Sequence, residues 1–143
     1  MNILFINPSL RLGSPTKYLP VGIASVMTYA ESKGYYFDFL DIDIDDLSDS
    51  QIERELCDKQ YDVVLTGTIV THYKWIKWFT KTIKQYHPNT KIIVGNSVAG
   101  SAVDLDQRHA LVVVVICIQG VGEAELSNIV QAAGALGAVL GLG

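Results

Sequence analysis

Two patterns of hydrophobic positions alternate along the chain. Residues 3–6 form a continuous apolar run that ends at Asn7-Pro8, which is typical of a strand covered on both faces. Residues 20–32 instead carry apolar side chains at roughly helical spacing, and Gly34 follows in the usual stop position. The opening of the chain therefore predicts a strand followed by a helix.

The same alternation continues along the sequence. It predicts further strands at residues 36–42, 62–67, 91–95 and 111–118. It also predicts helices at residues 48–59, 73–86 and 123–135, the first of them with Ile52, Leu56 and Cys57 on one face. Because strands alternate with helices, we expect an α/β fold with right-handed crossovers and a parallel sheet covered by helices on both sides.

The predicted strands that end in a readable loop are followed by small or polar residues. These tips are Asn7-Pro8-Ser9, Gly67-Thr68, Gly95-Asn96-Ser97 and Gly120-Val121-Gly122-Glu123. In open α/β sheets a ligand sits beyond the carboxyl ends of the strands, since side chains within the sheet are committed to packing. The sequence thus predicts a ligand crevice along this edge, and says less about which ligand it holds.

Composition limits the function classes. The chain has 143 residues, 49% hydrophobic and 18% charged, with a formal net charge of −4, so we expect one globular domain and no nucleic-acid partner. Cys57 and Cys117 lie far apart, as reduced thiols of a cytoplasmic protein do. The amino-terminal run is too short for a signal peptide, and the apolar stretch 132–143 is too short to cross a bilayer.

Two charged stretches invite binding functions that their details disfavour. Residues 73–86 mix lysines with aromatic residues, but in an acidic chain this pattern favours an amphipathic helix with its lysines in water. The acidic run 41–46 lacks the glycine and the terminal acid of a calcium loop, so solvated turn residues with Ser48 or Asp49 capping the next helix are expected. Asp41 or Asp43 receiving a ribose hydroxyl remains an alternative, although no phosphate-binding glycine motif accompanies them.

Catalytic and metal-binding patterns are absent from the sequence. His72, His87 and His109 form no ligand pair at helical spacing, and neither cysteine has another nearby, so we expect no metal site and no catalytic residue. His72, just after a predicted strand, either contacts a ligand or caps the following helix. For His87, at a helix end, we expect only a favourable interaction with the helix dipole.

Five segments in order carry a resemblance to a known family. They are Leu19-Pro20-Val21-Gly22-Ile23-Ala24; Asp41; Asp62-Val63-Val64-Leu65-Thr66-Gly67 with Thr68 and Thr71; Ile92-Ile93-Val94-Gly95-Asn96; and Gly120-Val121-Gly122-Glu123-Ala124-Glu125. Together they resemble the amino-terminal cobalamin (B12)-binding domain of B12-dependent radical SAM enzymes. This family includes the anaerobic magnesium-protoporphyrin IX monomethyl ester cyclases and various methyltransferases.

The resemblance implies a flavodoxin-like, five-stranded parallel sheet of order 2-1-3-4-5, with cobalamin across its carboxyl edge. The cofactor-binding residues that it implies are Asn7, Pro8, Ser9, Gly67, Thr68, Thr71, Gly95, Asn96, Ser97, Gly120, Gly122 and Glu123. Small residues let a flat macrocycle approach the backbone, and hydroxyls suit its amide groups. The Asp-x-His-x-x-Gly signature that supplies a cobalt ligand in other cobalamin domains is absent, and the loop after the first strand holds no histidine, so histidine ligation of the cobalt is not expected.

The resemblance also implies that cofactor binding and catalysis belong to different domains. We expect a B12-binding-like domain at residues 1–131 and an apolar, glycine-rich tail or interdomain segment at 132–143. The iron–sulfur cluster and S-adenosylmethionine of the family would belong to a downstream radical SAM domain that these residues do not include, so the chain is expected to be a noncatalytic fragment of such an enzyme. The alternative is a flavodoxin-like scaffold or regulatory domain that has lost the cofactor. A flavin is disfavoured because the first loop lacks a hydroxyl-rich phosphate nest.

Overall fold

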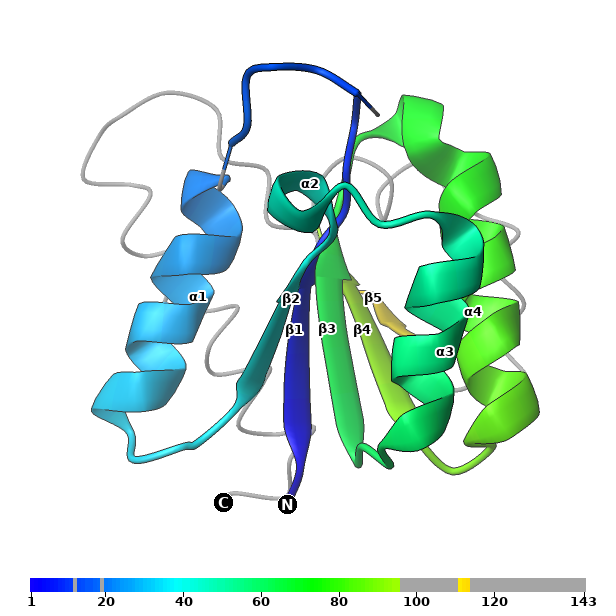
Figure 1. Cartoon of the computed structure of the whole chain (residues 1–143). Coiled ribbons are helices and arrows are strands. Elements are labelled where there is room, and N and C mark those ends of the chain that lie inside the picture. Colours follow the sequence, from blue (N-terminus) through cyan, green and yellow to red (C-terminus); the bar gives the residue numbers. More distant parts are fainter. Residues whose placement is uncertain (12, 19, 96–110, 114–143) are drawn as a thin grey trace.

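A parallel β-sheet forms the centre of the molecule (Figure 1). The computed structural model describes residues 1–11, 13–18, 20–95 and 111–113, and the predicted helix at 123–135 lies outside them. The strands are β1 (Ile3–Asn7), β2 (Asp38–Asp41), β3 (Val63–Gly67), β4 (Lys91–Gly95) and the short β5 (Leu111–Val113). The α/β class and the order 2-1-3-4 of the first four strands are confirmed.

The short β5 continues the sheet on the far side of β4, with which it pairs in parallel. The sequence predicts a longer strand at 111–118, and its part beyond Val113 lies outside the described residues. The complete five-stranded architecture with a full-length last strand therefore stays a prediction.

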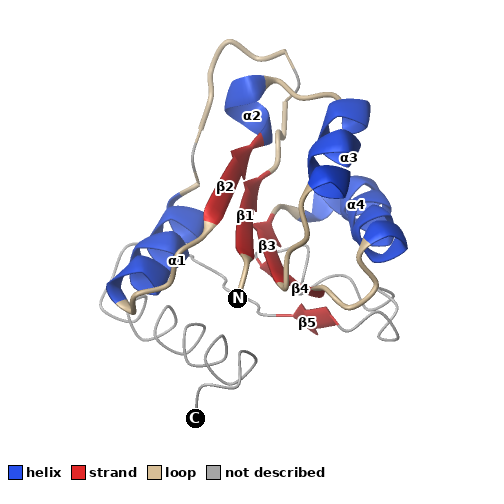
Figure 2. Cartoon of the chain, turned by 60° about the horizontal axis from the view of Figure 1, so that its bottom comes forward, coloured by secondary structure: helices blue, strands red, loops and turns tan. Residues whose placement is uncertain are grey.

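Helices cover both faces of the sheet, as the alternating pattern predicts (Figures 1 and 2). The helix α1 (Val21–Ser32) lies on one face, and α3 (Asp49–Asp58) and α4 (Tyr73–Tyr86) lie on the other. Successive strand residues point to opposite faces, which divides the core into two clusters. Leu4 and Ile6 pack with residues of α3 and α4, whereas Ile3 and Phe5 pack on the side of α1.

Local signals explain where these helices begin and end. Pro20 precedes α1, and Gly34, with φ of +80°, follows it in the left-handed conformation that glycine adopts without strain. Ser48 and Gln51 form a capping box at the start of α3. In α4 the lysines Lys74, Lys77 and Lys81 are exposed, as the amphipathic interpretation predicts, whereas Lys84 is half-buried and donates to the carbonyls of Pro88 and Thr90.

Three details correct the sequence-based expectations. The second strand is shorter than the predicted 36–42, because Tyr36 is exposed and the chain turns into a helix directly after Asp41. Cys57 is exposed and does not share the buried face of Ile52 and Leu56. The side chain of His87 does more than meet a helix dipole, since its Nε2 lies 2.6 Å from the carbonyl oxygen of Leu56 and links α4 to α3.

No helix in the described part of the chain is both long and apolar enough to cross a membrane.

Candidate ligand site at the carboxyl edge of the sheet

The carboxyl ends of β1, β2 and β3 meet at one edge of the molecule, at the top of Figure 1. The loop from β1 to α1, the one-turn helix α2 (Ile42–Asp45) and the 3-10 turn η1 (Val70–His72) all lie there. This is the location at which the sequence predicts a ligand crevice.

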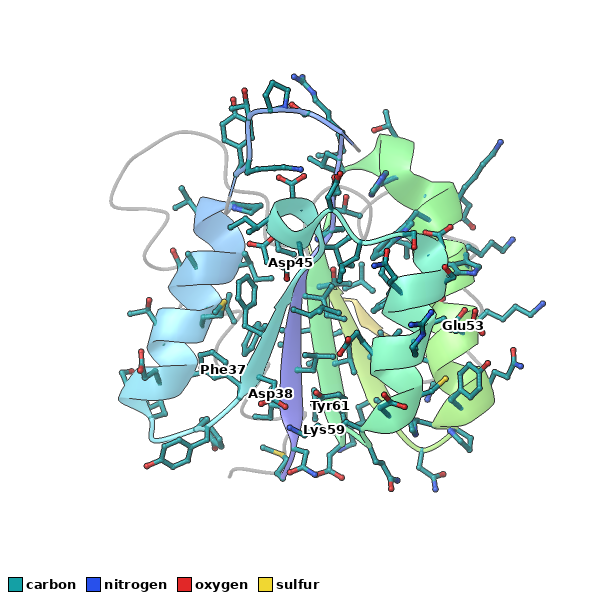
Figure 3. The ribbon with its side chains drawn as sticks, viewed as in Figure 1. Phe37, Asp38, Asp45, Glu53, Lys59 and Tyr61 are labelled. Atoms are coloured by element: carbon teal, nitrogen blue, oxygen red, sulfur yellow. The ribbon has the colours of Figure 1, made fainter. Side chains whose placement is uncertain are left out.

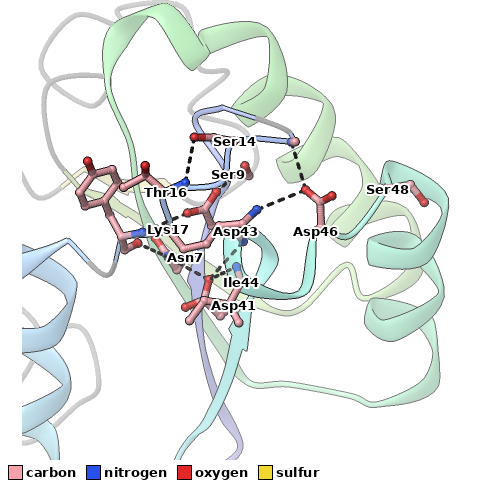
Figure 4. A network of polar contacts seen from close by, with 12 residues as sticks. Asn7, Ser9, Ser14, Thr16, Lys17, Asp41, Asp43, Ile44, Asp46 and Ser48 are labelled. Atoms are coloured by element: carbon pink, nitrogen blue, oxygen red, sulfur yellow. Dashed lines mark hydrogen bonds and ion pairs between the residues drawn. The ribbon is translucent and has the colours of Figure 1, made fainter.

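Asp41 organises the ends of β1 and β2 (Figure 4). Its Oδ1 accepts hydrogen bonds from the backbone nitrogens of Asp43 and Ile44, at 3.1 and 3.0 Å, and so caps α2. The same oxygen accepts a bond of 2.9 Å from Nδ2 of Asn7, the residue paired with Asp41 in the sheet. Asp41 therefore joins the two strand ends and starts α2 with one oxygen atom.

Asp43 holds both ends of the β1–α1 loop (Figure 4). Its Oδ1 accepts a hydrogen bond of 2.7 Å from Oγ of Ser9 at the beginning of the loop. Its Oδ2 accepts one of 3.2 Å from the backbone nitrogen of Tyr18 near the end. Asn7 adds a second tie to Tyr18, because its Nδ2 also donates to the Tyr18 carbonyl at 2.9 Å. The loop is thus fixed over the edge by side chains from its two flanks.

The middle of this loop is held by an exposed carboxylate. Asp46 accepts a hydrogen bond of 3.2 Å from the Gly13 backbone nitrogen and lies 3.4 Å from Nζ of Lys17. The Gly13 and Lys17 donors hold the pKa of Asp46 below its ordinary value. Asp46 itself adopts a left-handed conformation, with φ of 51°, where α2 ends.

These contacts correct the expectation of a solvated acidic turn. Asp41 and Asp43 are buried and bonded, while Asp45 and Asp46 are exposed. Sequence reasoning missed the helix α2 because a single turn is too short to show helical periodicity. The available signal was an aspartate directly before the apolar positions Ile42 and Ile44, which is the arrangement of a helix cap.

Two buried oxygen atoms in this network have no hydrogen-bond partner within the described residues: Oδ1 of Asn7 and Oδ2 of Asp41. Asn7 is only 1% exposed and Asp41 only 8%. An unpaired buried acceptor costs about 1–3 kcal/mol. Both atoms can therefore accept a hydrogen bond from a donor outside the described residues.

On the other side of the edge, β3 and β4 end in glycines that face each other in register, Gly67 beside Gly95. The ends of these two strands therefore carry no side chains, and the backbone is open to close approach. Thr68 follows Gly67 and is buried, and Thr71 lies exposed in η1.

His72 occupies the N-cap position of α4, but its side chain makes no capping hydrogen bond. The capping alternative for this residue is therefore wrong. Its Nδ1 lies 3.3 Å from Oγ1 of Thr68, and its ring stacks on Trp75. Burial lowers the pKa of the His72 imidazole.

The structure brings together part of the predicted cofactor-binding set. Asn7, Pro8 and Ser9 are buried at the end of β1 and the start of the β1–α1 loop, Gly67, Thr68 and Gly95 lie at or just after the ends of β3 and β4, and Thr71 lies in η1. Asn96, Ser97, Gly120, Gly122 and Glu123 lie outside the described residues. Contact of any of these residues with a cofactor stays a prediction.

Exposed apolar side chains lie along the same edge. They come from the β1–α1 loop, from the first residue of α1, from α2 and from the segment before η1: Leu10, Tyr18, Val21, Ile44 and Ile69. Apolar groups gathered around a few polar ones are typical of ligand sites and interfaces. Among the described residues, no group of three or more histidine, cysteine or acidic side chains could hold a metal ion.

The fold places the chain among the parallel α/β domains, a class in which ligands bind beyond the carboxyl ends of the strands. A family model described as B12 binding domain matches residues 11–130, which is most of the chain. The chain belongs to the B12-binding domain family. Comparison with curated proteins and with solved structures gave no match.

Proposed function

We propose that this chain is a cobalamin-binding module that holds the corrin ring along the carboxyl edge of its sheet. The observation that carries the proposal is the paired ends of β3 and β4, where Gly67 lies beside Gly95. A broad, flat macrocycle needs such a strip without side chains, because any Cβ there would hold it away from the backbone. Membership of the B12-binding family supports this ligand.

The polar groups of the edge fit the chemistry of cobalamin. Its peripheral amides both donate and accept hydrogen bonds. The unpaired acceptors of Asn7 and Asp41 need donors, and the hydroxyls of Thr68 and Thr71 can serve either role. We propose the cofactor contacts to be Asn7, Pro8, Ser9, Gly67, Thr68, Thr71, Gly95, Asn96, Ser97, Gly120, Gly122 and Glu123, with residues 1–131 as the binding unit and 132–143 as a separate apolar segment.

We further propose that the bound cobalamin serves a radical SAM domain, which would carry the iron–sulfur cluster and S-adenosylmethionine. Cobalamin supplies the capacity to carry a methyl group or an electron, for methyl transfer or oxidative ring closure. The residues of this chain bind the ring, orient it and present one face to the partner. The exposed apolar side chains Leu10, Tyr18 and Ile44 at the same edge suit contact with such a domain.

A second function, a scaffold or regulatory domain without a cofactor, is favoured by one observation. The Asn7 amide donates both to Tyr18 and to Asp41, and the Ser9 hydroxyl donates to Asp43, so these donors are already used inside the protein. A ligand would then find the Asn7 and Ser9 donors already engaged at the end of β1. The test below separates the two functions.

The test is a spectral titration with hydroxocobalamin followed by desalting. Cobalamin binding predicts an absorbance shift and retention of the red cofactor by the protein. Gly67→Leu would place a side chain on the strip beside Gly95 and is expected to weaken retention at least tenfold. Gln60→Leu, an exposed position just before β3 at the opposite edge, serves as the control and should bind like the unaltered chain. No shift and no retention by the unaltered chain would favour the scaffold.

A further inference from the structure

His72 is a nitrogen donor in the segment that carries the proposed cofactor contacts of β3. The strand ends at Gly67, Thr68 follows, and η1 then brings the chain to His72 at the start of α4 (Figure 1). His72 directly follows Thr71 and lies at the same edge of the sheet as the Gly67–Gly95 strip. The loop after β1, residues 7–13, contains no histidine.

The imidazole is held in place from two directions. Its Nδ1 lies 3.3 Å from the hydroxyl oxygen of Thr68, a buried residue. Its ring stacks on Trp75, with centroids 5.5 Å apart and planes at 18°. Trp75 stacks in turn on Phe79 at 4.8 Å, and Phe79 is fully buried in the core. The ring is consequently anchored to the sheet end and to α4.

This arrangement matches what a ligating histidine requires. A metal-bound imidazole usually donates its other ring N–H to a fixed acceptor, which selects the tautomer and orients the ring. If Nδ1–H donates to Oγ1 of Thr68, Nε2 carries the free lone pair. A corrin ring occupies the positions around cobalt in its own plane and leaves the axial positions for such a nitrogen.

We propose that Nε2 of His72 is an axial ligand to the cobalt of a corrinoid bound at the carboxyl edge, with Thr68 as the positioning residue whose hydroxyl oxygen accepts a hydrogen bond from Nδ1–H. This inference rests on the proposed function. It places the ligand after β3, whereas the sequence signature known from other cobalamin domains would place it after β1. No bond is broken in this step, since the neutral imidazole donates its lone pair to the metal.

The test uses cob(II)inamide, a corrinoid that lacks the nucleotide base and so brings no axial base of its own. Electron paramagnetic resonance of the complex should show nitrogen superhyperfine splitting on the cobalt lines. Protein grown with ¹⁵N-labelled histidine should change this splitting from triplets to doublets. His72→Ala should abolish the splitting, and so should His72→Phe, which keeps an aromatic ring against Trp75 and preserves folding.

Two further variants define what the splitting means. His87→Ala, at the opposite end of α4, should leave the spectrum unchanged. Thr68→Val should reduce the fraction of complexes with split lines, and Thr68→Ser should restore it, because the hydroxyl rather than the size of the side chain sets the tautomer. A merely structural role of Thr68 would not predict this rescue.

The outcomes separate this inference from the proposed function. Retention of cob(II)inamide after desalting measures binding, and the splitting measures ligation. Retention without nitrogen splitting, or splitting that persists in His72→Phe, would overturn the ligand assignment and leave cobalamin binding intact. If the unaltered chain retains neither cob(II)inamide nor hydroxocobalamin, both the ligand assignment and the proposed function fail.

Discussion

The polar groups at the two edges of the sheet differ in how completely they are hydrogen-bonded. At the amino edge, Asp38 accepts hydrogen bonds from Lys59 and from Tyr61, which lie beside it in Figure 3. The carbonyl oxygen of Tyr61 accepts one of 2.6 Å from the hydroxyl of Thr90. The backbone nitrogen of Asn2 donates to Asp62 at 2.7 Å, which ties the start of β1 to the start of β3.

At the carboxyl edge the network is larger but incomplete. Both of the buried side-chain atoms that lack a partner in the described part of the chain, on Asn7 and Asp41, lie there. Unpaired polar groups destabilise a protein, so they persist where something else requires them. The difference fits the proposal that the carboxyl edge binds a ligand and that the amino edge has no part in binding.

Among the substitutions that test this difference between the edges, Asp41→Ala is expected to change the free energy of unfolding most. The change removes the cap of α2 and the acceptor of Asn7, at a cost of about 1 and about 2 kcal/mol, but it also removes the unpaired Oδ2 and recovers about 1, so the free energy of unfolding should fall by about 2 kcal/mol. Urea denaturation measures it. Asp45→Ala is the matched control, because Asp45 lies in the same helix but is exposed and is expected to cost less than about 0.5 kcal/mol. Equal losses in the two variants would show that Asp41 does not organise the edge.

Thr90→Val tests the amino edge. Valine keeps the shape of threonine but leaves the Tyr61 carbonyl without its donor, so the loss should be about 1–2 kcal/mol. Because this edge is proposed to have no part in binding, the additional stability conferred by saturating hydroxocobalamin should equal that of the unaltered chain. Thr28→Val, at an exposed position of α1, controls for the substitution itself. A reduced ligand effect in Thr90→Val would contradict the division between the edges.

Asp43→Asn examines the tether of the β1–α1 loop. An amide can still accept from the Tyr18 N–H and can donate its Nδ2 to the Ser9 hydroxyl, but both bonds lose the charge of the carboxylate, so the cost should be about 1 kcal/mol. Hydrogen exchange at the Tyr18 amide should become faster. A double-mutant cycle with Ser9→Ala isolates the bond to the hydroxyl, and strictly additive effects would mean that Ser9 and Asp43 do not interact in solution.

The comparison also explains which features were predictable from sequence. The limits of α4 and β4 agree with the predicted ranges 73–86 and 91–95, because strong periodicity and Pro88 mark them. The direction of the strands follows from their alternation with helices, so the carboxyl edge and the position of Gly67 on it were predictable.

The hydrogen-bond network of that edge was not predictable from the sequence. Hydrogen bonds such as that from Ser9 to Asp43 join residues far apart in sequence, and neither residue carries a local pattern that names its partner. The expectation that Asp41 and Asp43 face water follows from composition, and tertiary contacts override it. Likewise, nothing in the sequence shows that the Thr68 hydroxyl meets the ring of His72, since this depends on the 3-10 turn between them.

The smallest expected effect concerns pH, and it should distinguish the two edges in alkali but not in acid. Lys59 and Tyr61 hold the pKa of Asp38 below its ordinary value, and Gly13 and Lys17 do the same for Asp46. A lowered carboxyl pKa contributes stability above the unfolded value of about 4 and loses it as the pH falls further, so both edges should loosen in acid.

Only the amino edge should respond to alkali. Burial, together with Asp38, raises the pKa of Tyr61 to about 12. A raised pKa contributes stability that is complete below the unfolded value of about 10 and is lost as the pH rises towards the folded value. Tyr86, whose bond to Glu53 also raises its pKa to about 12, is replaced by phenylalanine in the background used for the measurement. Between pH 10 and 12, the protection of amides against exchange, after correction for the intrinsic base-catalysed rate, should fall around β2 and β3 at the amino edge but not at Tyr18, and Tyr61→Phe should remove this response. If the loss of protection in alkali persists in Tyr61→Phe, the polar cluster of Asp38, Lys59 and Tyr61 is not what stabilises the amino edge.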